Sequence, residues 1–240
     1  MKKKPESSHT GLRDRLPLAP RREQHFRWRG NEISRVEGFT DAVFAFAITL
    51  LVMDIRLPED TVRPGDLGVT LLRLWPSFLS YVISFVVIGI MWINHRRMMQ
   101  LIDRIDAGFI NLTLLLLLCI AFLPFPTAVM MDHLTDPHER AVAVAFYCGC
   151  ITLTAVVYFL GWWHAARDRR LIASHVPQGA VRGMTRVYAP APFLYLTATL
   201  LAFAHVALSL SIVVALGILY MLPKIPAHSA IAKSEAGAGQ

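Results

Sequence analysis

Long segments with few or no charged residues are the feature that most constrains how this chain folds. One of them, from Val187 to Leu222, contains no Asp, Glu, Lys or Arg at all. About 20 consecutive apolar residues are enough to carry a helix across roughly 30 Å of membrane hydrocarbon. Several such segments in one chain predict an all-α integral membrane protein.

The composition agrees with this prediction. Hydrophobic residues make up 55% of the chain and charged residues only 17%, whereas about a quarter of the residues of a soluble domain are charged. The charged residues gather between the apolar segments, which is the distribution typical of a membrane protein.

The apolar segments predict a six-transmembrane-helix bundle formed by residues 33–223, between a basic and mostly disordered tail at 1–32 and a second tail at 224–240. The expected spans are 33–55, 77–97, 107–131, 141–163, 187–204 and 207–222. Pro124 and Pro126 should bend or stop the third span. The final 36 apolar residues would form a helix about 54 Å long. Two short spans with a turn near His205 fit better, and a single kinked helix, giving five spans, is the alternative.

Lysine and arginine are divided very unequally between the two sides of the predicted bundle. Twenty lie in the tail through Arg35, the 96–104 loop, the 167–186 loop and the C-terminal tail, and only four lie on the other side. Cytoplasmic loops of membrane proteins carry an excess of these residues. Both termini are therefore expected in the cytoplasm.

Several functional classes find no support in the sequence. The formal charge of +7 follows the tail and alternate loops rather than one amphipathic face, which argues against a nucleic-acid partner. All three cysteines lie in apolar segments, which favours buried thiols over disulfides or a metal site. No GxSxG or HExxH motif occurs. We expect no enzyme, no catalytic residues, no metal ligands and no cofactor.

Asp41 is unusual because it lies about eight residues into the first predicted span. A charged side chain at that depth costs roughly 2.5–3.5 kcal/mol unless it has partners or water. It is either a functional group or part of an ion pair that locks helices together. Arg35 points to a different side of the helix, so each of the two needs other partners. Glu37 shares a face with Asp41, and the two carboxylates either attract cations or lie in the interface.

One stripe of the first predicted helix is apolar. Phe46, Leu50 and Met53 follow an i, i+4, i+7 spacing, and Thr49 lies beside them. Taken alone, such a stripe is more often helix packing than the lining of a pore.

The second predicted span ends in the sequence WINHRR. Trp92, Asn94 and His95 therefore bring polar atoms to the cytoplasmic end of the bundle. There they are possible partners for Arg35 or Asp41 on the first helix, although simple packing is the default role for a histidine in this setting.

The segment RVEGFTDAVFAFAITLLVMDIRLP resembles the first helix of prokaryotic members of the transmembrane protein 175 family, which are relatives of the endolysosomal potassium channel. The family signature of Arg, three residues, Phe, Ser and Asp appears here as Arg35, Phe39, Thr40 and Asp41. The pieces WPSFLSYVISFVVIGIMWINHRRM and NLTLLLLLCIAFLPFPT are also similar to the family. Thr40 replaces the usual Ser, and Phe46 stands where the family commonly has Ile. The resemblance covers about residues 33–130.

The resemblance implies a six-helix subunit that assembles as a homotetramer in a prokaryotic inner membrane, with four copies of the first helix around a potassium pathway. Membrane lipid is the other expected partner. Phe46, Leu50 and Met53 would form the constriction, and a ring of Thr49 hydroxyls would favour potassium over sodium. This chain, like the family, lacks a TVGYG filter. The network implied to fix the first helix consists of Arg35, Phe39, Thr40, Asp41, Trp92, Asn94 and His95.

The sequence thus favours a passive potassium-permeable channel. A proton- or ion-coupled transporter that uses Asp41 and His95 as a relay is the alternative. No clear internal repeat is visible, which counts modestly against a transporter.

Overall fold

The computed structural model describes residues 31–57 and 67–221, and all the named elements in those ranges are helices. It has no named strand there, and only an isolated bridge pairs Ile102 with Ile172. The helices are α1 Asn31–Leu50, α2 Leu67–Arg73, α3 Trp75–Met99, α4 Ala107–Phe122, α5 Pro124–His133, α6 Arg140–Ala166, α7 Gln178–Tyr188, α8 Ala191–Leu201 and α9 Val206–Met221, with 3₁₀ turns η1 Leu51–Asp54 and η2 Arg167–Arg169. The predicted tails lie almost entirely outside the described residues.

Four helical stretches in the described part are long and apolar enough to cross a membrane: Glu32–Asp54, Trp75–Met99, Ala107–His133 and Arg140–Arg169. They coincide with the first four predicted spans, apart from a few residues at their ends. Helices α8 and α9 have 11 and 16 residues. A complete crossing by each of these two, and hence the count of six, stays a prediction.

Prolines mark two helix boundaries, and the sequence predicted the one at Pro124. Pro76 lies in the first turn of α3, where its missing N–H costs nothing. Pro124 begins α5 and separates it from α4 at Leu123, because a proline cannot donate to the carbonyl one turn earlier. Leu123 keeps helical backbone angles, so the third span is bent rather than stopped.

The final apolar stretch is divided between α8 and α9 at residues 202–205, close to His205. The hydroxyl of Ser209 on α9 donates to the carbonyl of Ala198 on α8 over 2.7 Å. The chain therefore reverses between the two helices, and the alternative of a single kinked helix is wrong.

The segment 167–186, expected as a loop, is helical from Gln178 onward. The hydropathy pattern did not predict helix α7, because its apolar residues are too widely spaced to form a continuous run. Ala180, Val181, Met184 and Tyr188 are buried on one side of the helix, while the arginines lie on the other. This pattern is typical of an amphipathic helix at a surface. The predicted span 187–204 accordingly begins inside α7 and continues through α8.

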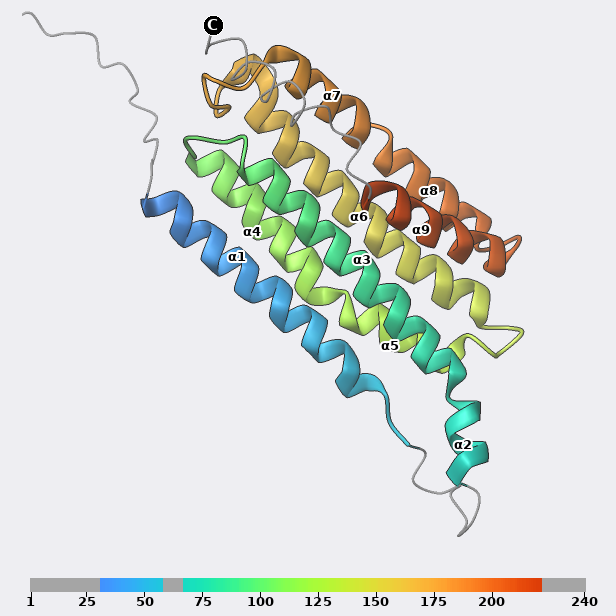
Figure 1. Ribbon diagram of the computed structural model, residues 1–240. Coiled ribbons are helices and arrows are strands. Elements are labelled where there is room, and N and C mark those ends of the chain that lie inside the picture. The colour runs from blue at the N-terminus through green and yellow to red at the C-terminus, as the bar shows by residue number, and fades with distance from the viewer. Residues whose placement is uncertain (1–30, 58–66, 222–240) are drawn as a thin grey trace, which may run out of the picture.

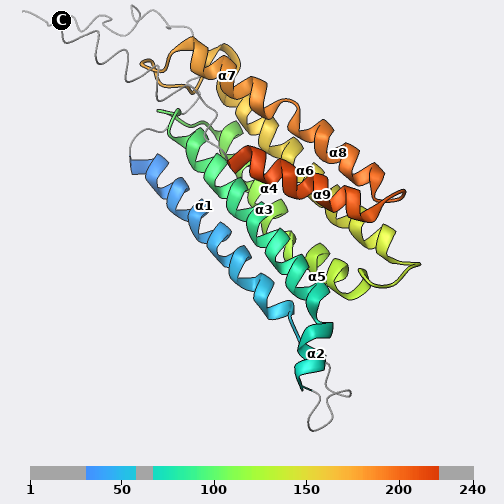
Figure 2. The ribbon, with the colours of Figure 1, turned by 45° about the vertical axis from the view of Figure 1, so that its right-hand side comes forward.

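The helices form an elongated bundle (Figure 1). Helix α1 lies along one edge, α7 and α8 lie along the opposite edge, and α3, α4 and α6 run between them. After rotation α1 remains the outermost helix on its side (Figure 2). Buried apolar residues form one cluster along the bundle and a second where the 100–106 and 167–177 connections meet. We call that second region the arginine-rich end, because Arg96, Arg104, Arg170 and Arg182 all belong to it.

Candidate functional site

Helix α1 has two contrasting faces. Thr40, Phe44, Ala47 and, in η1, Leu51 are buried against α3, α4 and α5, and their i, i+4, i+7, i+11 spacing makes one continuous contact stripe. The residues on the other side of α1, among them Phe39 and Phe46, are exposed in the described chain. Among the four candidate spans, that of α1 has the smallest share of buried residues. A helix packed on only one side leaves its second side for lipid, for water or for another copy of the subunit.

The residues predicted to form the constriction lie on this second side. Phe46 is 64% exposed and Met53 is 67% exposed, and Thr49 lies between them on the same side. Leu50 is half-buried at the margin of the stripe. The face that packing inside the subunit leaves unused is therefore the face that carries the predicted pore residues.

The hydroxyl of Thr49 donates to the carbonyl of Phe46 over 2.8 Å. This bond uses the single hydroxyl proton, so the oxygen lone pairs remain available. A hydroxyl held in this way presents an acceptor to whatever occupies the exposed side of α1.

Asp41 is anchored to α3. The indole Nε1 of Trp92 donates to its Oδ1 over 2.7 Å. The guanidinium of Arg96 lies 5.8 Å from the centre of the Trp92 ring, within range of a cation–π interaction. The second carboxylate oxygen has no hydrogen bond within the described residues. The side chains of Asp41, Trp92 and Arg96 thus form consecutive contacts where α1 packs against α3.

Arg35 does not take part in this arrangement. Its guanidinium lies 3.5 Å from the carboxylate of Glu32, one turn earlier on α1, and both side chains are exposed. Thr40 is buried, and its hydroxyl donates to the carbonyl of Val36 over 2.8 Å. Phe39 points outward. Within one subunit, Arg35 and Phe39 therefore lack the contacts with α3 that the implied network requires.

Asn94 and His95 are buried, but only His95 faces α1. The imidazole of His95 lies against the ring of Phe44, with 6.0 Å between centroids, and its Nε2 has no hydrogen-bond partner in the described chain. Asn94 donates to the carbonyl of Ile90 over 3.0 Å and accepts from Arg97 over 3.4 Å. The side chain of Asn94 thus pairs with Arg97 on its own helix and not with α1.

Arg97 connects α3 with the end of α9, a contact that sequence reasoning did not find. Its guanidinium donates to the carbonyls of Tyr220 and Met221 over 3.3 Å and 3.2 Å. The last carbonyls of a helix lack partners inside the helix, and a cation there is favourable. No local pattern in the sequence indicates this pairing, because more than a hundred residues separate its members.

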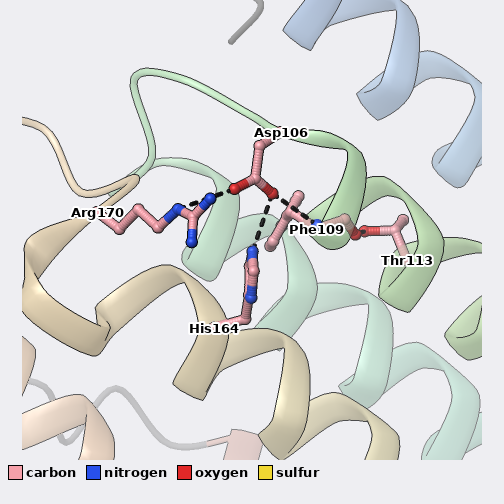
Figure 3. A network of polar contacts seen from close by, with 5 residues as sticks. All are labelled: Asp106, Phe109, Thr113, His164 and Arg170. Carbon is pink, nitrogen blue, oxygen red and sulfur yellow. Dashed lines mark hydrogen bonds and ion pairs between the residues drawn. The ribbon is translucent and has the colours of Figure 1, made fainter. Parts of the chain in front are cut away.

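A second polar cluster missed from the sequence lies at the arginine-rich end (Figure 3). Asp106 caps α4 by accepting the backbone N–H of Phe109 over 2.9 Å. Nε2 of His164 lies 2.9 Å from the same carboxylate oxygen, Oδ1 of Asp106. Nε of Arg170 lies 3.1 Å from the other oxygen, Oδ2. An aspartate directly before an apolar run is a recognised start signal for a helix, so the cap could have been found. Its partners His164, on α6, and Arg170, directly after η2, could not.

The environment of Asp106 favours its ionised form. Burial of the carboxyl opposes ionisation, but the N–H of Phe109, His164 and Arg170 outweigh it, so the pKa of Asp106 lies below the ordinary 3.8.

Gly108 makes the contact with His164 possible. A Cβ at this position would lie 2.8 Å from Cε1 and 2.9 Å from Nε2 of the imidazole. In the described residues, no group of three or more His, Cys, Asp or Glu side chains is arranged to hold a metal.

Comparison with known proteins places these features in context. Residues 35–124 match the family model described as endosomal/lysosomal potassium channel TMEM175. A potassium channel of Chamaesiphon minutus is 40% identical over 80% of this chain and 95% of its own length. The mouse endosomal/lysosomal proton channel TMEM175 is 29% identical over 71% of this chain but only 35% of its own length. The crystal structure of a lysosomal potassium-selective channel TMEM175 homolog from Chamaesiphon minutus superposes with a TM-score of 0.72 and 39% identity, covering 80% of this chain and 97% of that one.

Proposed function

The chain belongs to the TMEM175 channel family, and on this premise we propose that it is a potassium-permeable cation channel whose pore is lined by the outward face of α1. The observation that carries the proposal is the position of Phe46, Thr49 and Met53, which face away from their own subunit. The relatives are named as channels, and the chain is a channel-family protein, not an enzyme.

The proposed constriction consists of Phe46, Leu50 and Met53. Narrow rings of apolar side chains exclude water and thereby block ions, and a modest widening lets them wet and conduct. The chain has no TVGYG segment that could serve as a carbonyl-lined filter. Selectivity would then rest on Thr49, whose hydroxyl oxygen can replace part of the hydration shell of a potassium ion.

A pore along α1 requires more than one subunit, because the face in question is open in a single chain. We propose a homotetramer with four α1 helices around the axis, in the inner membrane of a prokaryotic cell and with both termini in the cytoplasm. The twenty-to-four division of Lys and Arg supports this orientation. Assembly would also place Arg35 and Phe39 next to a neighbouring subunit, where the rest of the implied network can form.

A coupled transporter based on Asp41 and His95 is less well supported. Asp41 is held by Trp92, and His95 lies against Phe44 without a hydrogen bond from its Nε2. A proton relay needs a chain of hydrogen-bonding groups between its members. Among the described residues, no hydrogen bond joins Asp41 to His95.

Flux through purified protein in liposomes separates the two functions. A channel should carry potassium down its gradient without saturation and without a coupled solute. Uptake that saturates and follows an imposed pH gradient would instead show a transporter. A proton-sensitive dye in the same vesicles reports whether protons permeate together with potassium.

Cysteine accessibility tests the position of the pore. The native Cys119, Cys148 and Cys150 are first replaced by alanine, and single cysteines are introduced at Phe46, Thr49 or Met53. A charged, membrane-impermeant thiol reagent should modify these three positions in the open channel and reduce the flux. A cysteine at Ala47, which faces the core of its own subunit, is the matched control and should remain unmodified.

A further inference from the structure

A groove between α6 and α7 opens at the arginine-rich end of the bundle. Its volume is about 420 Å³. It is lined by Phe159, Trp162, Trp163, Ala166, Arg167, Val181, Arg182, Thr185 and Arg186. The lining therefore combines three arginines with three aromatic side chains and contains no carboxylate.

The arginines of the groove are available to an anion. Arg182 and Arg186 lie one turn apart on the exposed side of α7, and neither has an ion-pair partner within the described residues. Arg167 lies 3.8 Å from Asp168, but both of these side chains are largely exposed. Exposed pairs at such distances contribute little, so Arg167 remains free to turn toward a ligand.

The aromatic half of the groove lies on the last turns of α6, beside α7. Trp163 is 54% exposed and lies edge-on to Phe159, with 6.0 Å between ring centroids. Trp162 is a buried member of the lining, and its Nε1 donates to the hydroxyl of Thr185 over 2.9 Å, which connects α6 to α7. This part of α6 lies near the end of the candidate span Arg140–Arg169. Tryptophans are enriched where the ends of spans meet lipid headgroups.

We propose that this groove binds an anionic phospholipid. Its phosphate would lie against Arg182, Arg186 and Arg167, and the upper part of an acyl chain would lie against Trp163 and Phe159. Arginine forks match phosphate oxygens in geometry and charge. A free phosphate would use the arginines but leave the aromatic side uncovered, whereas a phospholipid uses both. Basic pockets between helices on the cytoplasmic side are characteristic sites for such headgroups.

Native mass spectrometry of the purified protein in detergent measures the binding without any ion flux, so its result does not depend on the proposed channel activity. Phosphatidylglycerol should bind more tightly than phosphatidylcholine with the same acyl chains. The double variant Arg182→Gln/Arg186→Gln should bind phosphatidylglycerol about 30-fold more weakly. Arg73→Gln/Arg140→Gln removes the same charge from exposed positions at the opposite end and should bind like the wild type.

A second measurement locates the acyl chain. Phosphatidylglycerol with brominated chains quenches nearby tryptophans, so Trp163→Phe should remove a larger part of the quenching than Trp75→Phe. Trp75 is 55% exposed and is therefore a matched control. Equal affinities of the two double arginine variants, or equal quenching in the two tryptophan variants, would overturn the proposal. Displacement of the lipid by millimolar glycerol phosphate would show that the groove recognises phosphate alone, and would overturn the choice of a phospholipid.

Discussion

The indole Nε1 of Trp92 donates a hydrogen bond of 2.7 Å to the carboxylate of Asp41 and so connects α3 to α1 next to the face proposed to line the pore. Only one side of α1 is packed, so this bond is one of few polar contacts that fix the rotation of the helix. Because Arg96 lies over the ring of the same tryptophan, the position of the indole is itself restrained.

Trp92→Phe should destabilise the subunit by roughly 1 kcal/mol, because it keeps an aromatic ring but removes the donor to Asp41. Thermal unfolding of the purified protein in detergent measures the loss. Trp75→Phe is the control, since no hydrogen bond of the Trp75 indole occurs within the described residues. Equal melting temperatures of the two variants would show that the Asp41 contact contributes nothing.

Leu50→Ala should raise the conductance or relax the selectivity, because it widens the proposed apolar constriction. Leu51→Ala is the matched control, since Leu51 is fully buried against α3 and the neighbouring helices. We expect Leu51→Ala to cost about 2–5 kcal/mol of stability and to leave the conductance of the remaining channels unchanged. Single-channel recording distinguishes the two effects. A wild-type conductance in Leu50→Ala would remove this residue from the pore.

Thr49→Val should lower the permeability of potassium relative to sodium, since it replaces the hydroxyl with a methyl group of similar size. Thr49→Ser keeps the oxygen and should retain most of the preference. Reversal potentials under bi-ionic conditions give the permeability ratio. If valine and serine at this position behave alike, selectivity originates elsewhere.

Asp106→Asn should destabilise the arginine-rich end by roughly 1–3 kcal/mol, because it keeps a capping oxygen but leaves Arg170 and His164 without their charged partner. Asp103→Asn, at a less buried position on the same connection, should change the stability by less than about 0.5 kcal/mol. Thermal unfolding near neutral pH compares the two variants. An Asp106→Asn protein as stable as Asp103→Asn would contradict this account.

Acidification should remove the contribution of Asp106. Its pKa is lowered in the folded protein, so the ionised carboxylate stabilises the fold above the ordinary pKa of 3.8 and loses this effect as the pH falls through the folded value. The difference in melting temperature between the wild type and Asp106→Asn should therefore be constant near neutral pH and shrink below about pH 4. A difference that persists at lower pH would mean that charge at Asp106 plays no part.

Hydropathy alone predicted the four long spans, because the membrane requires about the same length of apolar helix from every chain that crosses it. Pro124 added the bend through a local property of the backbone, and the excess length of the final apolar stretch indicated the reversal near His205. The same method missed α7, since Arg182 and Arg186 interrupt its apolar residues. An amphipathic helix is recognised only from apolar residues that recur at every third or fourth position.

The candidate site was predictable only in part. The spacing of Phe46, Leu50 and Met53, with Thr49 beside them, placed these residues on one side of a helix. The structure leaves Phe46, Thr49 and Met53 exposed and half-buries Leu50. The spacing could not reveal that Asn94 would turn toward Arg97, or that His164 and Arg170 would meet Asp106. Such pairs depend on how helices far apart in the sequence lie against one another, and no local pattern encodes that arrangement.

Gly108 puts two physical preferences in conflict at one position. Alanine makes a better helix than glycine by about 1 kcal/mol, so a rule based on helix propensity would recommend the exchange. The added methyl group would, however, displace the imidazole of His164 from Asp106. Alanine would therefore stabilise α4 as an isolated helix but weaken its contact with α6. A library of variants should retain glycine at position 108 because the site has no room for a methyl group, and not because glycine has a freer backbone.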